Sequence, residues 1–260
     1  MDQPPFLFAI PLRSRLVSKD WRRICKLLSQ TISSIINQTN PNFHVVVGCH
    51  ELPELAIPSD PRLVFLQTST SVPTNLQEQM DDKRRKRRLA LAYLRALGGG
   101  YVMPVDADDL VSRRIVQYLR TCPPRFGYII NEGYELDYQT GLIKYTPRFN
   151  KFCGSSAIFR FSAEDLPLSE SDESSYVADM FQNHTKWKDT AEKLGRPLQN
   201  FPFCAAVYVT NNSENHSVMA GNVGWKRTIL RIFTPARKPS RDLAAEFSLK
   251  GACFCANERW

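Results

Sequence analysis

The sequence predicts an α/β protein whose core is a doubly wound, mixed sheet in a single domain, followed by a helical C-terminal tail. Three observations lead to this prediction. Short apolar runs alternate with helical patterns in the first half of the chain. In the second half the pattern changes to strands joined by a tight turn. The 260 residues, 43% of them hydrophobic, are enough for one substantial core.

The first half of the chain provides alternating strands and helices. A helix with Ser18 as a plausible N-cap carries apolar residues from Trp21 to Ile36 near helical spacing. A basic helix over 82–97 ends at three glycines. The runs expected to form buried, largely parallel strands are 6–12, 43–49, 62–67 and 101–105.

The second half predicts shorter strands and two further helices. One helix runs from a cap at Ser112 to about position 121, and the other covers 176–194. We expect one domain over 1–220, with halves at about 1–111 and 112–220, and a basic, partly amphipathic tail over 221–260. The expected strands of this half are 128–130, 134–138, 141–145, 155–161 and 203–209.

The N-terminal residues and the cysteines indicate in which cellular compartment the protein is expected. The opening "MDQPPFLFAI" has no basic region of the kind that begins a signal peptide. No stretch approaches the roughly 20 apolar residues of a membrane span. The seven cysteines are scattered and odd in number, which favours reduced thiols. We therefore expect a cytoplasmic protein.

The charge is strongly basic. Net charge is +8, and the run "KRRKRR" at 83–88 holds six of the positive charges. Such a balance suits an anionic partner, either a phosphorylated substrate, a nucleic acid or a membrane surface. A solvated helix face is the commoner explanation of a basic run.

Three acidic residues follow the fourth expected strand directly, in "YVMPVDADDLVS". Ligands of an open α/β sheet collect at the carboxyl ends of its parallel strands. Asp106 and Asp108, two positions apart, can converge on Mg²⁺ or Mn²⁺, which accept carboxylate oxygens together with substrate phosphates. Asp109 or Ser112 would cap the next helix. One cap cannot account for three acids, so the sequence predicts a metal site at Asp106 and Asp108.

Two segments, "TISSIINQTNPNFHVVVGCHE" and "GGGYVMPVDADDLVS", resemble the donor half of the GT-A-type glycosyltransferases, particularly family 2. The match is clear over about the first half of the chain and looser toward Ser217. The resemblance implies a GT-A (Rossmann-like) fold. It also implies an Asp-x-Asp motif that holds Mn²⁺ or Mg²⁺ against the diphosphate of a UDP-, GDP- or dTDP-linked sugar. The expected activity is that of a hexosyl- or deoxyhexosyltransferase.

The same resemblance implies roles for further residues. The loop after the first strand, with Pro11 and Arg13, would bind the nucleotide. Glu51 stands where relatives place a paired Asp, and His216 stands where several place an additional metal ligand, although an ordinary loop histidine is an equal alternative. The residues expected to bind the donor are Pro11, Arg13, Glu51, Lys83, Arg84, Lys86, Asp106 and Ala107, and those expected to bind the metal are Asp106, Asp108 and His216.

An inverting transferase needs a general base for the acceptor hydroxyl. Family 2 enzymes usually supply an Asp from a Glu-Asp pair, but the corresponding segment here is "QNHTKW". His184 has a suitable side chain. Asp179, about one turn upstream on the expected helix, could orient His184 or serve as the base itself. A core histidine with one hydrogen bond is the alternative for His184.

The acceptor is expected to be a glycan or a lipid-linked glycan. The tail segment "GWKRTILRIFTPARK" mixes cations with apolar residues, which suits either peripheral contact with an anionic membrane surface, placing the enzyme near envelope polysaccharide synthesis, or packing on the domain. Three other readings stay open. They are a nucleic-acid-binding module that uses the basic run, a nucleotidyltransferase and a degenerate transferase. The acidic cluster argues against nucleic acid as the partner.

Overall fold

The structure is a computed structural model that describes residues 4–174, 177–181, 183–214 and 235–249. Its larger sheet has seven strands, and β9 is antiparallel to both of its neighbours while every other pair is parallel. In spatial order the strands are β10 (Gln199–Asn200), β6 (Gly127–Ile129), β9 (Ala157–Ser162), β4 (Gly99–Pro104), β1 (Phe6–Pro11), β2 (His44–Cys49) and β3 (Leu63–Gln67).

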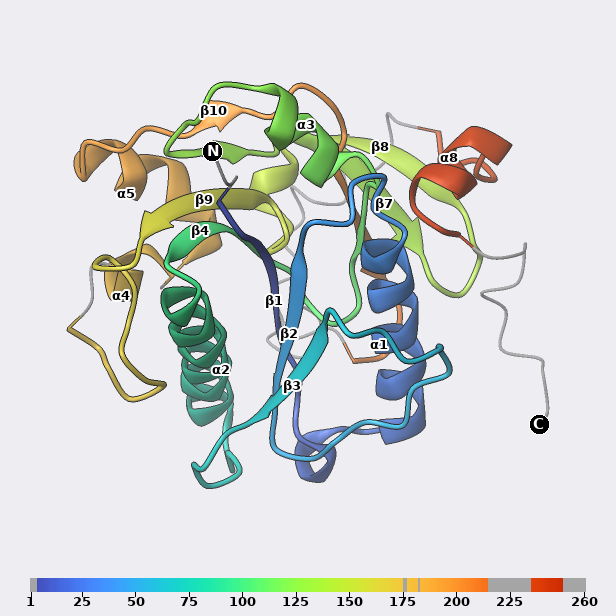
Figure 1. Ribbon diagram of the computed structural model, residues 1–260. Coiled ribbons are helices and arrows are strands. Elements are labelled where there is room, and N and C mark those ends of the chain that lie inside the picture. The colour runs from blue at the N-terminus through green and yellow to red at the C-terminus, as the bar shows by residue number, and fades with distance from the viewer. Residues whose placement is uncertain (1–3, 175–176, 182, 215–234, 250–260) are drawn as a thin grey trace.

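Strand β1 lies at the centre of this sheet because both of its faces are apolar. Side chains alternate between the faces of a strand, so Phe6 and Phe8 enter one hydrophobic core and Leu7 enters the other. Helix α1 (Trp21–Ile36) covers the first face and helix α2 (Leu76–Ala96) covers the second (Figure 1). The predicted doubly wound, mixed α/β sheet is therefore confirmed.

Both helices begin at residues other than those expected. Asp20 caps α1, because its side chain accepts a hydrogen bond from the Arg23 N–H, and Ser18 does not. Helix α2 begins at Leu76, well before position 82, after Asn75 caps the Glu78 N–H. The first turns of α2 are almost entirely polar, so apolar periodicity gave no signal there.

A second sheet packs beside the first. Its order is β5-β11-β7-β8, and β7 and β8 form the predicted antiparallel hairpin. Helix α3 (Ile115–Thr121) follows β5, and helix α8 (Arg241–Glu246) packs on the sheet through Leu243 beside Phe247. The strands are β5 (Leu110–Val111), β11 (Ala206–Thr210), β7 (Glu132–Asp137) and β8 (Ile143–Pro147).

The single helix expected over 176–194 was wrong. The chain forms a short helix α4 (Val177–Met180), a 3₁₀ turn η3 (His184–Lys186) and helix α5 (Trp187–Lys193). Asn183 interrupts the run, because its side chain accepts the Thr185 N–H and so competes with the helical backbone. The turn places the buried Trp187 against Phe159. The described residues also form the 3₁₀ turns η1 (Arg15–Val17) and η2 (Phe149–Lys151).

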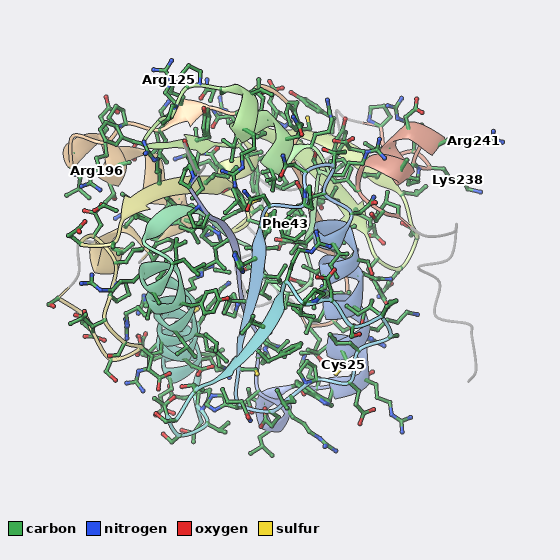
Figure 2. The ribbon with its side chains drawn as sticks, viewed as in Figure 1. Cys25, Phe43, Arg125, Arg196, Lys238 and Arg241 are labelled. Carbon is green, nitrogen blue, oxygen red and sulfur yellow. The ribbon has the colours of Figure 1, made fainter. Side chains whose placement is uncertain are left out.

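The C-terminal region is described only in part. Helix α8 is the described helix of the tail. Its first residue, Arg241, and the preceding Lys238 point outward from the protein (Figure 2). The boundary at 220 and most of the amphipathic segment lie outside the described residues, so that domain division stays a prediction. Among the residues described, no helix combines the length and the apolar character that crossing a membrane requires.

Candidate functional site

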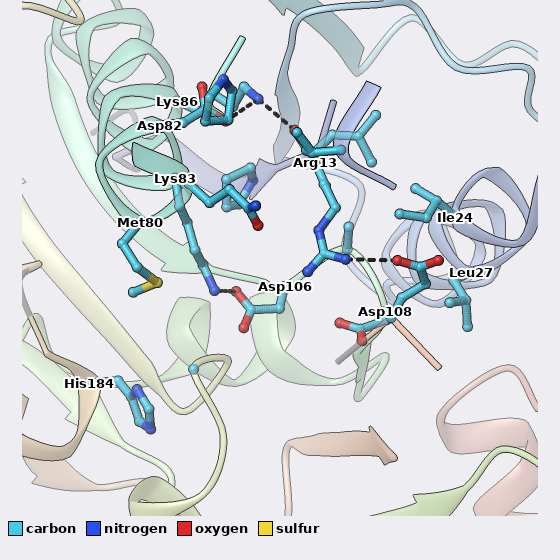
Figure 3. Close-up of a pocket in the computed structure, with 18 of the residues that line it drawn as sticks. Arg13, Ile24, Leu27, Met80, Asp82, Lys83, Lys86, Asp106, Asp108 and His184 are labelled. Atoms are coloured by element: carbon cyan, nitrogen blue, oxygen red, sulfur yellow. Dashed lines mark hydrogen bonds and ion pairs between the residues drawn. The ribbon is translucent and has the colours of Figure 1, made fainter. Parts of the chain in front are cut away.

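The carboxyl ends of β1 and β4 open onto a cavity of about 380 Å³. Strand β1 lies between β2 and β4. The chain runs from β1 to β2 and β3 on one side and then returns through α2 to β4 on the other side. Such a reversal separates the loops that follow the two strands and creates the crevice in which α/β sheets bind ligands. Arg13 reaches the cavity from the loop after β1, Lys83 from α2, and Asp106 and Asp108 from the loop after β4 (Figure 3). Pro11 and Ala107, which the sequence analysis assigns to donor binding, line it too.

Asp106 is held by two cations from one helix. Its Oδ1 lies 2.8 Å from Lys83 Nζ and 3.3 Å from Arg87 Nη2. Lys83 and Arg87 are four residues apart and therefore share a face of α2. Burial acts to raise the pKa of the Asp106 carboxyl, but these two cations outweigh it and bring the pKa below its usual range. Asp106 is an ionised carboxylate at neutral pH.

Asp108 has a different environment. Its Oδ2 accepts a hydrogen bond of 2.7 Å from Asn212 Nδ2, in the segment after β11. Burial, and then the negative charge of Asp106, raise the pKa of Asp108 to about 6. Two carboxylates on one cavity oppose each other's ionisation, so this site favours a positively charged ligand.

Asp109 points away from the cavity and is fully buried. Its Oδ2 accepts hydrogen bonds from Ser155 Oγ (2.6 Å) and Cys153 Sγ (3.1 Å), and its Oδ1 accepts one from the Val209 N–H (3.2 Å). Burial raises the pKa of this carboxyl well above its ordinary value. Asp109 therefore ties the acidic loop, residues 106–109 after β4, to strand β11.

The helix cap expected at Asp109 or Ser112 is only partly found. Residue Arg114 precedes α3 and makes no side-chain cap bond, so Asp109 is not a cap. Ser112 Oγ accepts the Arg114 N–H at 3.1 Å, just before the helix begins. The physical reason is the burial of Asp109, which directs its carboxylate into the protein interior.

Arg13 forms an ion pair with a residue that sequence reasoning missed. Its Nη1 lies 2.7 Å from Glu214 Oε2, and Glu214 Oε1 accepts the N–H groups of Lys19 and Asp20. Asn211 and Ser213 have positive φ values of 57° and 68°, so the chain turns back after β11. The turn brings Glu214 to the cavity. Asn tolerates this left-handed conformation, and the "TNNSEN" stretch was a usable signal of such a turn.

Lys86, predicted to bind the donor, lines the cavity but has a structural role. Its Nζ donates to Leu12 O (2.8 Å) and to Asp82 Oδ2 (2.6 Å), and Asp82 also bonds His50 Nε2 (2.9 Å). Burial lowers the pKa of Lys86. The lysine fastens α2 to the end of β1.

The other basic residues of the run have partners of their own. Arg84, also predicted to bind the donor, does not line the cavity and pairs with Asp81 on the helix surface at 2.6 Å. Arg88 donates to Glu170 O at 2.7 Å and pairs with Glu173. The sequence expectation was that one or two residues of this run point inward. Lys86 and Arg87 are buried, and the other four are partly exposed. Lys83 and Arg87 continue the apolar stripe of α2 by helical spacing.

Glu51 does not line the cavity. Its carboxylate accepts Ser14 Oγ at 2.8 Å and the Arg15 N–H at 3.0 Å. Burial acts to raise its pKa, but these hydrogen bonds prevail and the pKa lies below its ordinary value. Glu51 fixes the loop after β1 from outside, so the prediction that it touches the donor has no support in the described site.

His184 faces the cavity opposite α2 (Figure 3). Its Nε2 is buried and has no hydrogen-bond partner among the described residues. Burial lowers the pKa of the imidazole to about 4, although the nearby Asp106 acts in the opposite direction. The side chain is therefore neutral at neutral pH. For Asp179 the structure describes only the backbone, in α4, and His216 lies outside the described residues.

Asp106 and Asp108 are the residues that could hold a divalent cation. Carboxylate oxygens are the ligands that Mg²⁺ and Mn²⁺ prefer, and Mg²⁺ is commonly held by one or two carboxylates together with substrate phosphates and water. The described residues include no group of three or more His, Cys, Asp or Glu side chains arranged around a metal position. The donor set therefore fits a cation that shares its coordination with a bound ligand.

Comparisons with known proteins are sparse. The chain matches no protein-family model, and no curated protein matches it. One solved structure with similarity is a "putative nucleotide-diphospho-sugar transferase" from Desulfovibrio desulfuricans G20. The identity is 12% and the TM-score 0.31, over 89% of this chain and 95% of that one. A likeness of this size says nothing about the residues of the cavity.

Proposed function

We propose that the protein is a metal-dependent glycosyltransferase that moves a sugar from a nucleoside-diphosphate sugar to a glycan or lipid-linked acceptor. One observation carries the proposal. Two carboxylates, Asp106 and Asp108, and two cations, Arg13 and Lys83, line a single cavity at the point where the sheet reverses its strand order. The resemblance of the acidic loop and the upstream helix and strand to family 2 transferases supports the sugar-nucleotide assignment.

The charges of the cavity suit a diphosphate with a metal ion. Carboxylates alone repel phosphate, so a ligand of this kind requires a cation between them. When bound, a divalent metal stabilises the negative charge that develops on the leaving diphosphate. Lys83 is the cation of α2 that is best placed for a phosphate, because its side chain lines the cavity and remains 26% exposed. Arg13 lines the same cavity.

His184 is the proposed general base of an inverting reaction. Its buried Nε2 has no partner among the described residues and it lines the cavity that holds Asp106. A neutral imidazole can accept the proton of an acceptor hydroxyl. Two further assignments rest on the sequence alone. They are Asp179 as an orienting residue and His216 as a further metal ligand.

The basic run supports this function over nucleic-acid binding. Lys83 and Arg87 are paired with Asp106, and Lys86 is buried against Asp82. A contact strip for nucleic acid needs a row of solvent-facing cations. A nucleotidyltransferase would carry a glycine-rich phosphate loop after β1, and "IPLRSRLVSKD" contains no glycine.

The test is thermal unfolding with nucleoside diphosphates and sugar nucleotides, each with Mn²⁺, Mg²⁺ or EDTA. A ligand that binds only the folded protein stabilises it by about 2.7 kcal/mol at one hundred times its Kd. We expect a metal-dependent rise for one nucleotide, and its loss in Asp106→Ala and Asp108→Ala. Arg84→Gln is the matched control from the same basic run and should respond as the wild type does. A folded protein with no response to any donor would refute the proposal and leave a degenerate relative.

A further inference from the structure

The segment Cys153, Gly154 and Ser155 lies against the acidic loop, and we name it the carboxylate cradle. Ser155 Oγ accepts the Asp106 N–H at 2.9 Å and donates to Asp109 Oδ2 at 2.6 Å. Cys153 Sγ also donates to Asp109. Ser155 therefore holds the backbone of the acidic loop at Asp106, and both ends of the cradle hold the side chain of Asp109.

Gly154 itself leaves space for a carboxylate. A Cβ atom at this position would lie 2.9 Å from Asp106 Oδ2 and 3.6 Å from Oδ1, and its three nearest atoms all belong to Asp106. Real Cβ atoms essentially never come so close to another atom, so the Asp106 carboxylate would have to move. Gly154 also lines the cavity. The carboxylate thus occupies room that any side chain at 154 would take.

The backbone gives no separate reason for a glycine here. Gly154 is not among the residues with positive φ, so an alanine can adopt its conformation. The contrast with Gly133 is informative. A Cβ at Gly133 would lie 2.5 Å from the buried ring of Phe149 and would disturb the core. At Gly154 the atom that must move is the end of a side chain in the cavity.

We propose that Gly154 is a positioning residue of the site, and that the absence of its side chain sets where the Asp106 carboxylate meets the ligand. The inference rests on the proposed function and deepens it, because it names a residue that acts on the metal and diphosphate only through Asp106. A side chain at position 154 would press on Asp106 Oδ2, whereas Lys83 and Arg87 bind the other oxygen, Oδ1. The carboxylate would therefore shift. The ligand then meets a displaced oxygen.

The first experiment is isothermal titration calorimetry. The nucleoside diphosphate that stabilises the wild type most is titrated into the protein in the presence of Mn²⁺, and its affinity is measured. Gly154→Ala should bind at least about tenfold more weakly, while its melting temperature stays within a few degrees of the wild type. Ser156→Ala is the matched control, since the neighbouring Ser156 Oγ is buried without a partner among the described residues, and it should bind as the wild type does. Wild-type affinity in Gly154→Ala, whatever its melting temperature, would overturn the inference.

A second experiment needs no ligand. Replacing glycine by alanine stabilises a protein when the native conformation accepts the new side chain, because the unfolded chain loses freedom. In an Asp106→Ala background the tight contact is gone, so Gly154→Ala should raise the melting temperature there and not in the wild type. An equal change in both backgrounds would show that Gly154 does not act through Asp106.

The two failures are separable. If the wild type binds no nucleoside diphosphate with either metal, the proposed function falls, while the melting temperatures still decide whether Gly154 seats Asp106. If the wild type binds and Gly154→Ala binds equally well, only the positioning role falls. Should Gly154→Ala not fold, the test moves to the Asp106→Ala background, where the close contact is absent. The double variant should fold, and its failure to fold would overturn the role of Gly154.

Discussion

Lys83 Nζ lies 2.8 Å from Asp106 Oδ1, so helix α2 places a positive charge directly beside the acidic loop. Arg87 shares the same oxygen, but its side chain is only 8% exposed, whereas that of Lys83 is 26% exposed. The two cations therefore differ in what they can do. Arg87 is a buried partner of Asp106, whereas Lys83 is more accessible to a ligand that enters the cavity.

Lys83→Gln should weaken nucleoside diphosphate binding by about tenfold or more, because a hydrogen bond to a charged group contributes about 1.5–3 kcal/mol. Its effect on stability should stay below about 1 kcal/mol, as for partly exposed ion pairs. Titration calorimetry and urea unfolding measure the two quantities. Arg84→Gln should change neither, and equal affinity losses in both variants would contradict a specific role for Lys83.

Asp109→Ala should destabilise the protein by about 2–4 kcal/mol. It leaves the Val209 N–H and the Ser155 hydroxyl without their acceptor in a fully buried position. Urea unfolding provides the measurement. Asp109→Asn keeps one acceptor oxygen and should lose less. A change below about 0.5 kcal/mol in Asp109→Ala would mean that the acidic loop is held in place by other contacts.

Glu214→Ala should cost about 3 kcal/mol, because it breaks a buried ion pair and leaves the Arg13 charge uncompensated. It also frees the N–H groups of Lys19 and Asp20 at the start of α1. The comparison is with Glu173→Ala, whose side chain is 74% exposed in its pair with Arg88 and whose loss should cost under about 0.5 kcal/mol. Similar unfolding midpoints for the two variants would show that Glu214 does not hold the loop.

His184 should make the protein less stable in mild acid. Its pKa is about 4 in the folded protein and 6.5 ordinarily, so between these values the unfolded chain binds a proton that the folded protein does not. Stability from this group is complete above about pH 6.5 and decreases as the pH falls toward 4. The loss between pH 7 and pH 5 should be at most about 2 kcal/mol, and less if solvent reaches the ring.

His184→Gln provides the comparison, since it removes the titrating ring. Urea unfolding of both proteins at pH 7 and pH 5 should show a smaller pH dependence in the variant. An identical pH dependence in the two proteins would mean that the imidazole is solvated and titrates normally.

The alternation of strands and helices was sufficient to predict the sheet, because β1, β2 and β4 are apolar on both faces and must lie inside it. The position of Asp106 and Asp108 at the cavity could also be predicted, for a local reason. They follow a buried strand directly, and the carboxyl end of such a strand is where this architecture places its ligands. Both residues do line the cavity.

The remainder of the site depends on contacts between distant parts of the chain. Asn212 and Gly154 touch the acidic loop only after both sheets have formed, and nothing near them in the sequence points to Asp106 or Asp108. Glu51 was misplaced for the same reason. Its position after β2 matches a donor-binding pattern. Its carboxylate, however, accepts hydrogen bonds from Ser14 Oγ and the Arg15 N–H, and the side chain does not line the cavity.

The separation of these partners along the chain has a consequence for synthesis on the ribosome. Arg13 and Glu214 are 201 positions apart, and Asp109 and Val209 are 100 apart. Contacts this distant form late, because the cost of closing a long loop must be met before they contribute. The nascent chain can build its first strands and helices early, but the acidic loop has its full set of bonds only once β11 has emerged. A fragment that ends after β4 should therefore lack the complete cavity, and truncated chains released during translation would not compete with the complete protein for its ligand.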